Sequence, residues 1–283
     1  MRVLQLDLDL PRRGLPLAQM LAAVALAGAL TSVCVRAQEI KIGGTGGALA
    51  TMQMLADAYR KTRPEAEITV LPSLGSGGGI KAVLAGGIQI AVSSRPIEPS
   101  ETSQGANAYE YGRTPFVFAV AVKNAVAGIT VKDLVEIYSG ARGRWPDGAT
   151  IQIVLRPVGD SDSDMVRSIS PEVRQAKTLA EKRPGMLFEV TDQEAADDIE
   201  NIPGAFGTTT LAQIISEQRA IKALRFNGVE PSAKTVADGS YPYFKRLFIV
   251  TGPKTPVPAH QFIAFVRSAA GREILARTGH ALP

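Results

Sequence analysis

Hydrophobic and polar positions along the first part of the chain predict strands and helices in alternation. Alternating side chains, typical of half-buried strands, are followed by glycine-rich stretches at 43–47 and 75–79, and then by amphipathic segments. The pattern predicts strands at 38–42, 68–71 and 88–92 and helices at 49–62 and 80–85. Strands separated by helices indicate an α/β fold with mixed, mostly parallel sheets, which binds ligands at the carboxyl ends of its strands.

Two long β-like runs divide the rest of the chain. Residues 114–123 and 241–250 enclose a second α/β region at 129–239, and an amphipathic helix is predicted at 260–278. Such a chain leaves one lobe near residue 120 and returns near 245, so that two crossings form a hinge beside a cleft. The predicted division is lobe 1 at 38–118 and 243–283, and lobe 2 at 119–242.

The first 37 residues have the features of a secretory signal peptide. Arg12 and Arg13 precede an apolar run at 15–35, and residues 35–37 form a small-residue exit of the A-x-A type. We expect cleavage before Gln38, export by the general secretory route rather than the twin-arginine route, and a periplasmic mature protein. A retained membrane anchor is the alternative, because the run approaches the roughly 20 residues that span a bilayer.

Composition narrows the function further. Cys34 is the only cysteine and follows the bulky Val33, which favours removal with the signal peptide over lipid attachment; the mature chain then has no disulfide and no zinc-thiolate site. With 45% hydrophobic and 20% charged residues the chain is expected to be globular. The net charge of +4 comes from scattered Lys and Arg, so a nucleic-acid partner is not expected.

Two motifs resemble ligand-binding loops without matching them. The glycines at 75–79 lead to Ile80 and Lys81, whereas a P-loop has glycine directly before its lysine. Two interpretations of this stretch are left open: a generic helix start that accepts an anion, or a plain turn. The acidic run at 160–164 begins like a calcium loop but has neither its glycine nor its final glutamate. We therefore expect it to cap a helix, with no metal and no cofactor bound.

The sequence gives little support for an enzymatic function. The only histidines, His260 and His280, lie near the carboxyl end, where we expect them on the surface or in a helix, and there is no G-x-S-x-G nucleophile turn. No catalytic residue is predicted.

A series of short motifs, in the same order along nearly the whole mature chain, resembles the phosphate-binding components of bacterial ABC importers, which have the two-lobed type II periplasmic binding fold. The motifs are at 55–59, 74–81, 90–96, 134–140 with Trp145, 203–207 and 241–246. The resemblance implies an interlobe cleft at the hinge that holds a small oxyanion, phosphate first of all. It also implies a membrane permease and an ATPase as partners, and we expect a monomer.

The resemblance also implies which residues hold the anion. That family uses loop amides and hydroxyls, one arginine, and an aspartate that accepts the proton carried by phosphate. On this sequence these groups correspond to the glycine loop of Thr45, Gly46 and Gly47, to Ser76 and Gly77 at a helix start, and to Arg156. Charge-assisted hydrogen bonds from Arg156 and helix-terminal amides would supply the affinity.

This sequence departs from the family pattern at two places. Ser94, followed by Arg95, stands where the proton-accepting aspartate is found, and Asp160, Ser161 and Asp162 follow the arginine where the family has a Gly-Ser-Gly-Thr loop. Either Asp160 or Asp162 accepts a proton from the ligand, or both cap the helix and phosphate selectivity is lost. A sensory or scaffolding relative that does not feed a transporter is the alternative function.

Overall fold

The structure is a computed structural model that describes residues 39–283. The predicted signal peptide, its cleavage before Gln38 and the alternative of lipid attachment at Cys34 lie outside these residues. Among the helices described, none is long and apolar enough to cross a bilayer.

The first elements follow the predicted alternation of strands and helices. They are β1 (Ile40–Gly44), η1 (Gly46–Ala48), α2 (Leu49–Thr62), β2 (Ile68–Val70), α3 (Gly75–Ala85), β3 (Ile90–Ser93) and α4 (Pro99–Ser103). The expected helix at 49–62 has the predicted limits. The helix expected at 80–85 begins at Gly75 instead, because the glycine stretch forms its first turn rather than a loop before it.

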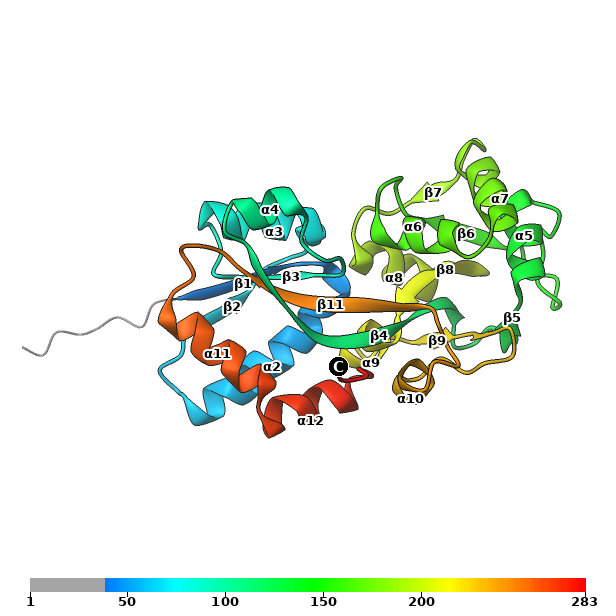
Figure 1. Ribbon diagram of the computed structural model, residues 1–283. Coiled ribbons are helices and arrows are strands. Elements are labelled where there is room, and N and C mark those ends of the chain that lie inside the picture. Colours follow the sequence, from blue (N-terminus) through cyan, green and yellow to red (C-terminus); the bar gives the residue numbers. More distant parts are fainter. Residues whose placement is uncertain (1–38) are drawn as a thin grey trace, which may run out of the picture. The chain divides into compact units, whose positions relative to one another are not determined.

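Two long strands, β4 (Asn107–Ala121) and β11 (Phe244–Thr251), run side by side through the middle of the fold (Figure 1). They pair antiparallel along the whole length of β11, with one register irregularity between Leu247 and Phe248. β4 begins seven residues before the predicted run at 114–123, whereas β11 begins three residues after the start of the run predicted at 241–250 and ends one residue beyond it. The first part of β4 was not predicted, because its polar residues do not form a hydrophobic pattern.

The elements between these strands form a second α/β region. They are β5 (Gly128–Ile129), α5 (Val131–Ser139), β6 (Gln152–Leu155), α6 (Ser161–Ser168), α7 (Pro171–Glu181), β7 (Leu187–Phe188), α8 (Asp192–Asn201), β8 (Ala205–Thr210), α9 (Leu211–Ser216), β9 (Ile221–Ala223), β10 (Arg225–Phe226) and α10 (Ala233–Ala237). β6 pairs in parallel with β7 and β8, and β1 pairs in parallel with β2 and β3. The main sheet has the order β2-β1-β3-β11-β4-β8-β6-β7, with β9 on β4, and is therefore mixed.

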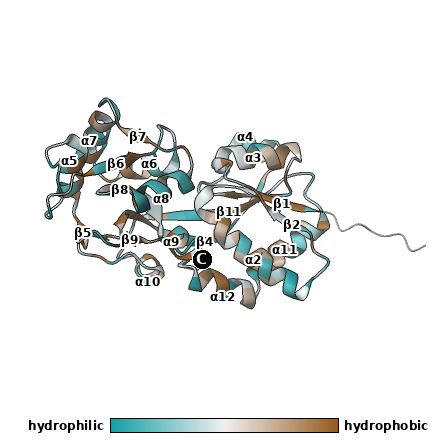
Figure 2. Ribbon diagram, turned by 180° about the vertical axis from the view of Figure 1, so that it is seen from behind, coloured by the Kyte–Doolittle hydropathy of each residue, from teal (hydrophilic) through white to brown (hydrophobic). Residues whose placement is uncertain are grey.

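Separate hydrophobic clusters lie on the two sides of the long strands. One set packs side chains of β1, α2, β3 and the last helices; the other packs side chains of α5, β6, α7 and β8. We call these parts lobe 1 and lobe 2. Brown hydrophobic segments inside both lobes can be followed in Figure 2. Along β4 the core changes between Tyr111 and Phe116, and the predicted boundary at 118 stays a prediction.

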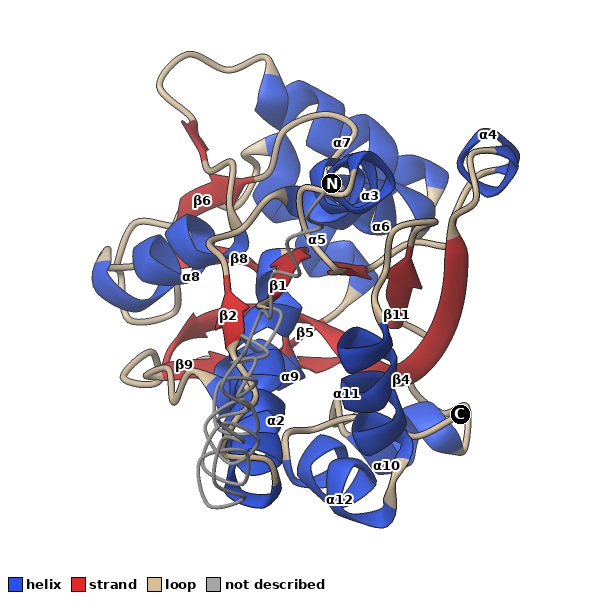
Figure 3. Cartoon of the chain, turned by 90° about the vertical axis from the view of Figure 1, so that its left-hand side faces the viewer, coloured by secondary structure: helices blue, strands red, loops and turns tan. Residues whose placement is uncertain are grey.

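The end of the chain forms two helices where one was predicted at 260–278. They are α11 (Val257–Arg267) and α12 (Ala269–Arg277), separated by Ser268, whose backbone is extended and whose hydroxyl accepts a hydrogen bond from the amide of Gly271. Both pack beside α2 (Figure 3). His260 lies on the exposed face of α11, whereas His280 is buried beyond α12, which corrects its expected surface or helical position.

Candidate functional site

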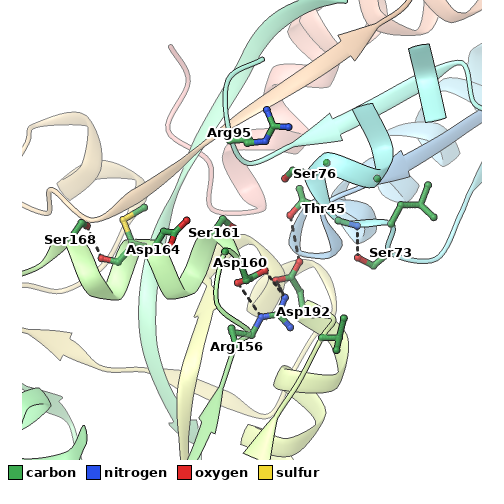
Figure 4. Close-up of a pocket in the computed structure, with 17 residues that line it drawn as sticks. Thr45, Ser73, Ser76, Arg95, Arg156, Asp160, Ser161, Asp164, Ser168 and Asp192 are labelled. Carbon is green, nitrogen blue, oxygen red and sulfur yellow. Dashed lines mark hydrogen bonds and ion pairs between the residues drawn. The ribbon is translucent and has the colours of Figure 1, made fainter. Parts of the chain in front are cut away.

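Loops at the carboxyl ends of β1, β3 and β6 surround a pocket of about 580 Å³ (Figure 4). Thr45 and the start of α3 contribute from lobe 1, and Arg156, the start of α6 and Asp192 contribute from lobe 2. The position agrees with the rule that α/β sheets bind ligands beyond the carboxyl ends of their strands. Of the predicted site residues, those that line the pocket are Thr45, Ser76, Gly77, Arg95, Arg156, Asp160 and Ser161.

Gly44 allows β1 to turn into the pocket. Its φ is +140°, and a Cβ atom there would lie 1.9 Å from the carbonyl oxygen of Val92 on the neighbouring strand β3. The next amide, that of Thr45, donates to the same carbonyl over 2.9 Å. The glycine therefore lets two strand ends approach closely enough to bring Thr45 to the edge of the pocket.

Arg156 is the buried cation of the pocket. It follows β6, and its side chain is 4% exposed. Its Nε and one Nη donate to the carboxylate of Asp160 at 3.3 and 3.1 Å, and the other Nη donates to the carbonyl oxygen of Glu189 at 2.9 Å. A fourth contact, of 3.4 Å, reaches Asp192. Four of the five N–H donors of this guanidinium are thus engaged by the protein itself.

Asp160 caps α6, as its place before the helix predicted. Its carboxylate accepts a hydrogen bond of 2.9 Å from the amide of Asp162 while it also pairs with Arg156. Burial, and after it the charge of Asp162, raises the pKa of Asp160. Residues 39–283 contain no group of three acidic, histidine or cysteine side chains that could hold a metal ion.

Asp162 does not line the pocket, contrary to its predicted place in the site. It is 2% exposed and forms an ion pair with Lys245 of β11, while one of its oxygens accepts a hydrogen bond of 3.1 Å from Thr208. Burial opposes the ionised forms of both partners, but their opposite charges prevail, so that the pKa of Asp162 is lowered and that of Lys245 is raised.

Ser94 does not line the pocket either, contrary to its predicted place in the site. Its hydroxyl is 3.1 Å from that of Ser76 and donates to Ser161 over 3.2 Å. Ser161 in turn accepts from Lys245 over 3.2 Å. A chain of hydroxyls therefore links lobe 1 to lobe 2 at the position where the family resemblance implies an aspartate.

Arg95 faces the pocket edge but is held by another partner. Both its Nη atoms bond the carboxylate of Glu101, at 2.9 and 2.7 Å, and the side chain is 31% exposed. The hydrogen bond to Glu101 is the main cause of the raised pKa of Arg95. Its guanidinium is thus engaged on α4 and is partly exposed, whereas that of Arg156 is buried.

The glycine loop is already in contact with an acidic side chain. The amide of Gly47 donates to Asp192 over 2.9 Å, and the hydroxyl of Thr45 lies 3.5 Å from the same oxygen. The carbonyl oxygen of Gly46 accepts from Gln193 over 3.1 Å. Gly46 and Gly47 therefore contact the first turn of α8 and do not line the pocket.

Sequence reasoning missed Asp192 and Lys245. The start of α8 could have been found from its capping box, because Thr191 and Glu194 bond each other's amides as a T-x-x-E motif predicts. Nothing in the local sequence shows that this helix start meets a glycine loop 145 residues away. Lys245 lies in a strand between Phe244 and Arg246, and its partner is likewise set by the tertiary fold.

Residues 31–270 match the PBP superfamily domain, and the chain belongs to this superfamily. It is 24% identical over 251 residues to the phosphate-binding protein PstS of Borreliella burgdorferi, in an alignment that covers 85% of this chain and 88% of the relative. It is also 27% identical over 236 residues to the protein of the same name in Bacillus subtilis, with 81% and 75% covered.

A solved structure of similar fold is the ABC-type phosphate transport receptor from Vibrio cholerae, with a TM-score of 0.61, 21% identity, and coverage of 87% of this chain and 100% of that one. Together with these relatives it shows that the predicted two-lobed α/β fold of periplasmic binding proteins is correct.

Proposed function

We propose that this protein is a periplasmic solute-binding protein that captures phosphate or a related tetrahedral oxyanion in the interlobe pocket and delivers it to an ABC importer. It acts as a binding protein and not as an enzyme. Two relatives that align with most of the chain are named phosphate-binding proteins, which supports phosphate as the first ligand to test. A permease and an ATPase are the partners that such a role requires.

The observation that carries the proposal is the position of Arg156. A guanidinium that is 4% exposed lines the pocket together with Thr45, Ser76 and Ser161, which carry hydroxyls. Hydroxyls and a buried arginine are strong hydrogen-bond donors to an oxyanion. The first turn of α3 adds backbone amides at the positive end of a helix, which also favours negative charge.

Titration calorimetry on the mature protein, with phosphate and sulfate as ligands, tests this function. We expect phosphate to bind, and Arg156→Ala to weaken binding by about 1.5–3 kcal/mol, roughly ten- to hundredfold, because a charge-assisted bond inside the pocket is lost. Arg95→Ala is the matched control and should weaken binding less, because the side chain of Arg95 is 31% exposed and its charge is screened by solvent more than that of Arg156, which is 4% exposed. Unchanged affinity in Arg156→Ala, with a native circular dichroism spectrum, would contradict the proposed site.

Selectivity is assigned to Asp160, which lines the pocket next to Arg156. Three of the roughly four lone-pair positions of its carboxylate are used by Arg156 and by the helix cap, which leaves one for a proton on the ligand. Sulfate has no such proton near neutral pH, so wild type should prefer phosphate. Asp160→Asn should narrow the difference between phosphate and sulfate in the same titrations; wild-type binding of sulfate as tight as that of phosphate would refute this role.

A further inference from the structure

Asp192 places a carboxylate on the donors that are assigned to the ligand. Three groups proposed to hold an oxyanion, the Gly47 amide, the Thr45 hydroxyl and the Arg156 guanidinium, all contact its two oxygens, at 2.9, 3.5 and 3.4 Å. Its side chain is 13% exposed and lines the pocket (Figure 4). An amide, a hydroxyl and an arginine around one carboxylate are the chemistry of an anion site.

The contact joins the two lobes. Gly47 and Thr45 belong to the loop after β1 in lobe 1, whereas Asp192 begins α8, whose Ala195, Ala196 and Ile199 pack in a cluster of lobe 2. Gln193 adds a second bond across the same junction, to the carbonyl oxygen of Gly46. A Cβ atom on Gly46 would lie 2.4 Å from Oε1 of Gln193 and 2.8 Å from Oδ2 of Asp192, so the fit of the helix start to this loop depends on glycine.

We propose that Asp192 is a built-in competitor of the ligand, a tethered anion that occupies part of the oxyanion site and holds the lobes together until a free anion displaces it. This inference rests on the proposed function for the identity of the free anion. A tethered group competes at the high effective concentration of an intramolecular contact. Its carboxylate also repels an incoming oxyanion in a partly buried site, where charges are weakly screened.

In consequence, Asp192 lowers the affinity of the protein for the free anion. In the absence of that anion, Asp192 itself bridges the two lobes. Asp192→Asn keeps the size of the side chain and an oxygen that can accept from Gly47, but removes the charge. We expect it to bind phosphate at least tenfold more tightly than wild type, a gain of about 1.4 kcal/mol. Without ligand it should be more open than wild type, because its contacts with Gly47 and Thr45 of lobe 1 are no longer hydrogen bonds to a charged group.

The experiment combines phosphate titration calorimetry with small-angle scattering on three proteins: wild type, Asp192→Asn and Asp197→Asn. Asp197 is the matched control, since it lies on the same helix, loses the same charge, and has a side chain that is 58% exposed and paired with Arg219 away from the pocket. We expect Asp197→Asn to behave as wild type in both measurements. Asp192→Ser serves as a second variant should the asparagine variant prove unstable.

Each outcome decides one claim. Tighter phosphate binding together with a larger ligand-free radius of gyration in Asp192→Asn supports the competitor role. Phosphate binding no tighter than that of wild type, or a ligand-free radius equal to that of wild type, overturns it, because Asp192 would then not compete with the ligand or not hold the lobes. If no variant binds phosphate but Asp192→Asn still expands, the proposed phosphate function fails while the interlobe role of Asp192 stands.

Discussion

At the scale of single residues, His280 is a buried side chain that can titrate. It is 2% exposed, and its Nδ1 lies 3.1 Å from the carbonyl oxygen of Leu275, which can only accept. Nδ1 therefore carries the ring hydrogen. Nε2 is buried and has no hydrogen-bond partner within the described part of the chain. Protonation would place a second charged donor in this unpartnered position.

His280 should therefore make the protein less stable as pH falls. Burial lowers its pKa from 6.5 to about 4. Below pH 6.5 the unfolded chain takes up a proton that the folded protein does not accept until about pH 4, so stability is full above this window and is lost as pH falls through it. The loss attributable to this group is roughly 3 kcal/mol.

Urea unfolding at about pH 7.5 and about pH 4.5 measures this loss. His280→Asn keeps a donor for Leu275 but cannot titrate, and should have a smaller difference in unfolding free energy between the two pH values than wild type. His260→Asn, on the exposed face of α11, is the control and should leave that difference unchanged. An equal pH dependence in wild type and His280→Asn would show that other groups cause it.

At the scale of elements, the glycines of α3 have two different roles. A Cβ atom on Gly79 would lie 2.8 Å from the Cα atom of Gly44, so this glycine lets α3 pack directly on β1. A Cβ atom on Gly77, in the same helix, would meet nothing within 4 Å. Within this glycine-rich sequence, which suggested a phosphate loop, Gly79 thus allows helix packing. Gly77 leaves open space at the pocket.

The two positions should respond oppositely to alanine. Gly77→Ala should raise the free energy of unfolding by about 0.5–1 kcal/mol, because alanine loses less entropy than glycine when a helix forms. Gly79→Ala has the same entropic advantage, but its methyl group forces α3 away from β1, which should lower the free energy of unfolding by about 1–3 kcal/mol. Urea unfolding of both variants checks this; a stabilised Gly79→Ala would mean that the helix shifts without cost.

The elements themselves could largely be predicted, and the reasons for the errors are physical. The helix at 49–62 is amphipathic and follows a glycine stretch, so its limits were recognised. The first part of β4 is polar and is held in the strand by pairing with β11, which no local pattern reveals. The break at Ser268 depends on one hydroxyl cap within a continuously amphipathic stretch.

The pocket could be predicted only in part. Arg156 was assigned from the family resemblance, and its position directly after a strand and before a helix start agrees with that assignment. Asp162 was assigned to the site from its neighbours along the chain, but in the fold it is turned to Lys245. The role of Asp192 depends on the approach of two lobes, so it could not be predicted from the sequence. Local pattern thus identified the loops of the site, and tertiary contacts decided which side chains face the pocket.

At the scale of the whole molecule, β4 and β11 join the lobes, and a buried ion pair fastens one of these strands to lobe 2. Lys245 of β11 is 4% exposed and pairs with Asp162 of α6. Its ammonium group also lies 5.9 Å from the centre of the Phe116 ring on β4. The pair therefore links both crossing strands to the helix that begins at the pocket.

Removal of one partner from this pair should destabilise the molecule far more than removal of both. Lys245→Met leaves the charge of Asp162 buried and uncompensated, which should lower the free energy of unfolding by about 3–5 kcal/mol. In the double variant Lys245→Met with Asp162→Asn the charge is absent and the contact with Thr208 can persist, so much of the lost stability should be recovered.

The exposed pair of Lys234 and Asp238 provides the control, and Lys234→Met should lower the free energy of unfolding by less than about 1 kcal/mol. Urea unfolding of the four proteins measures these differences; if Lys245→Met costs no more than Lys234→Met, the buried pair does not fasten the crossing strands to lobe 2.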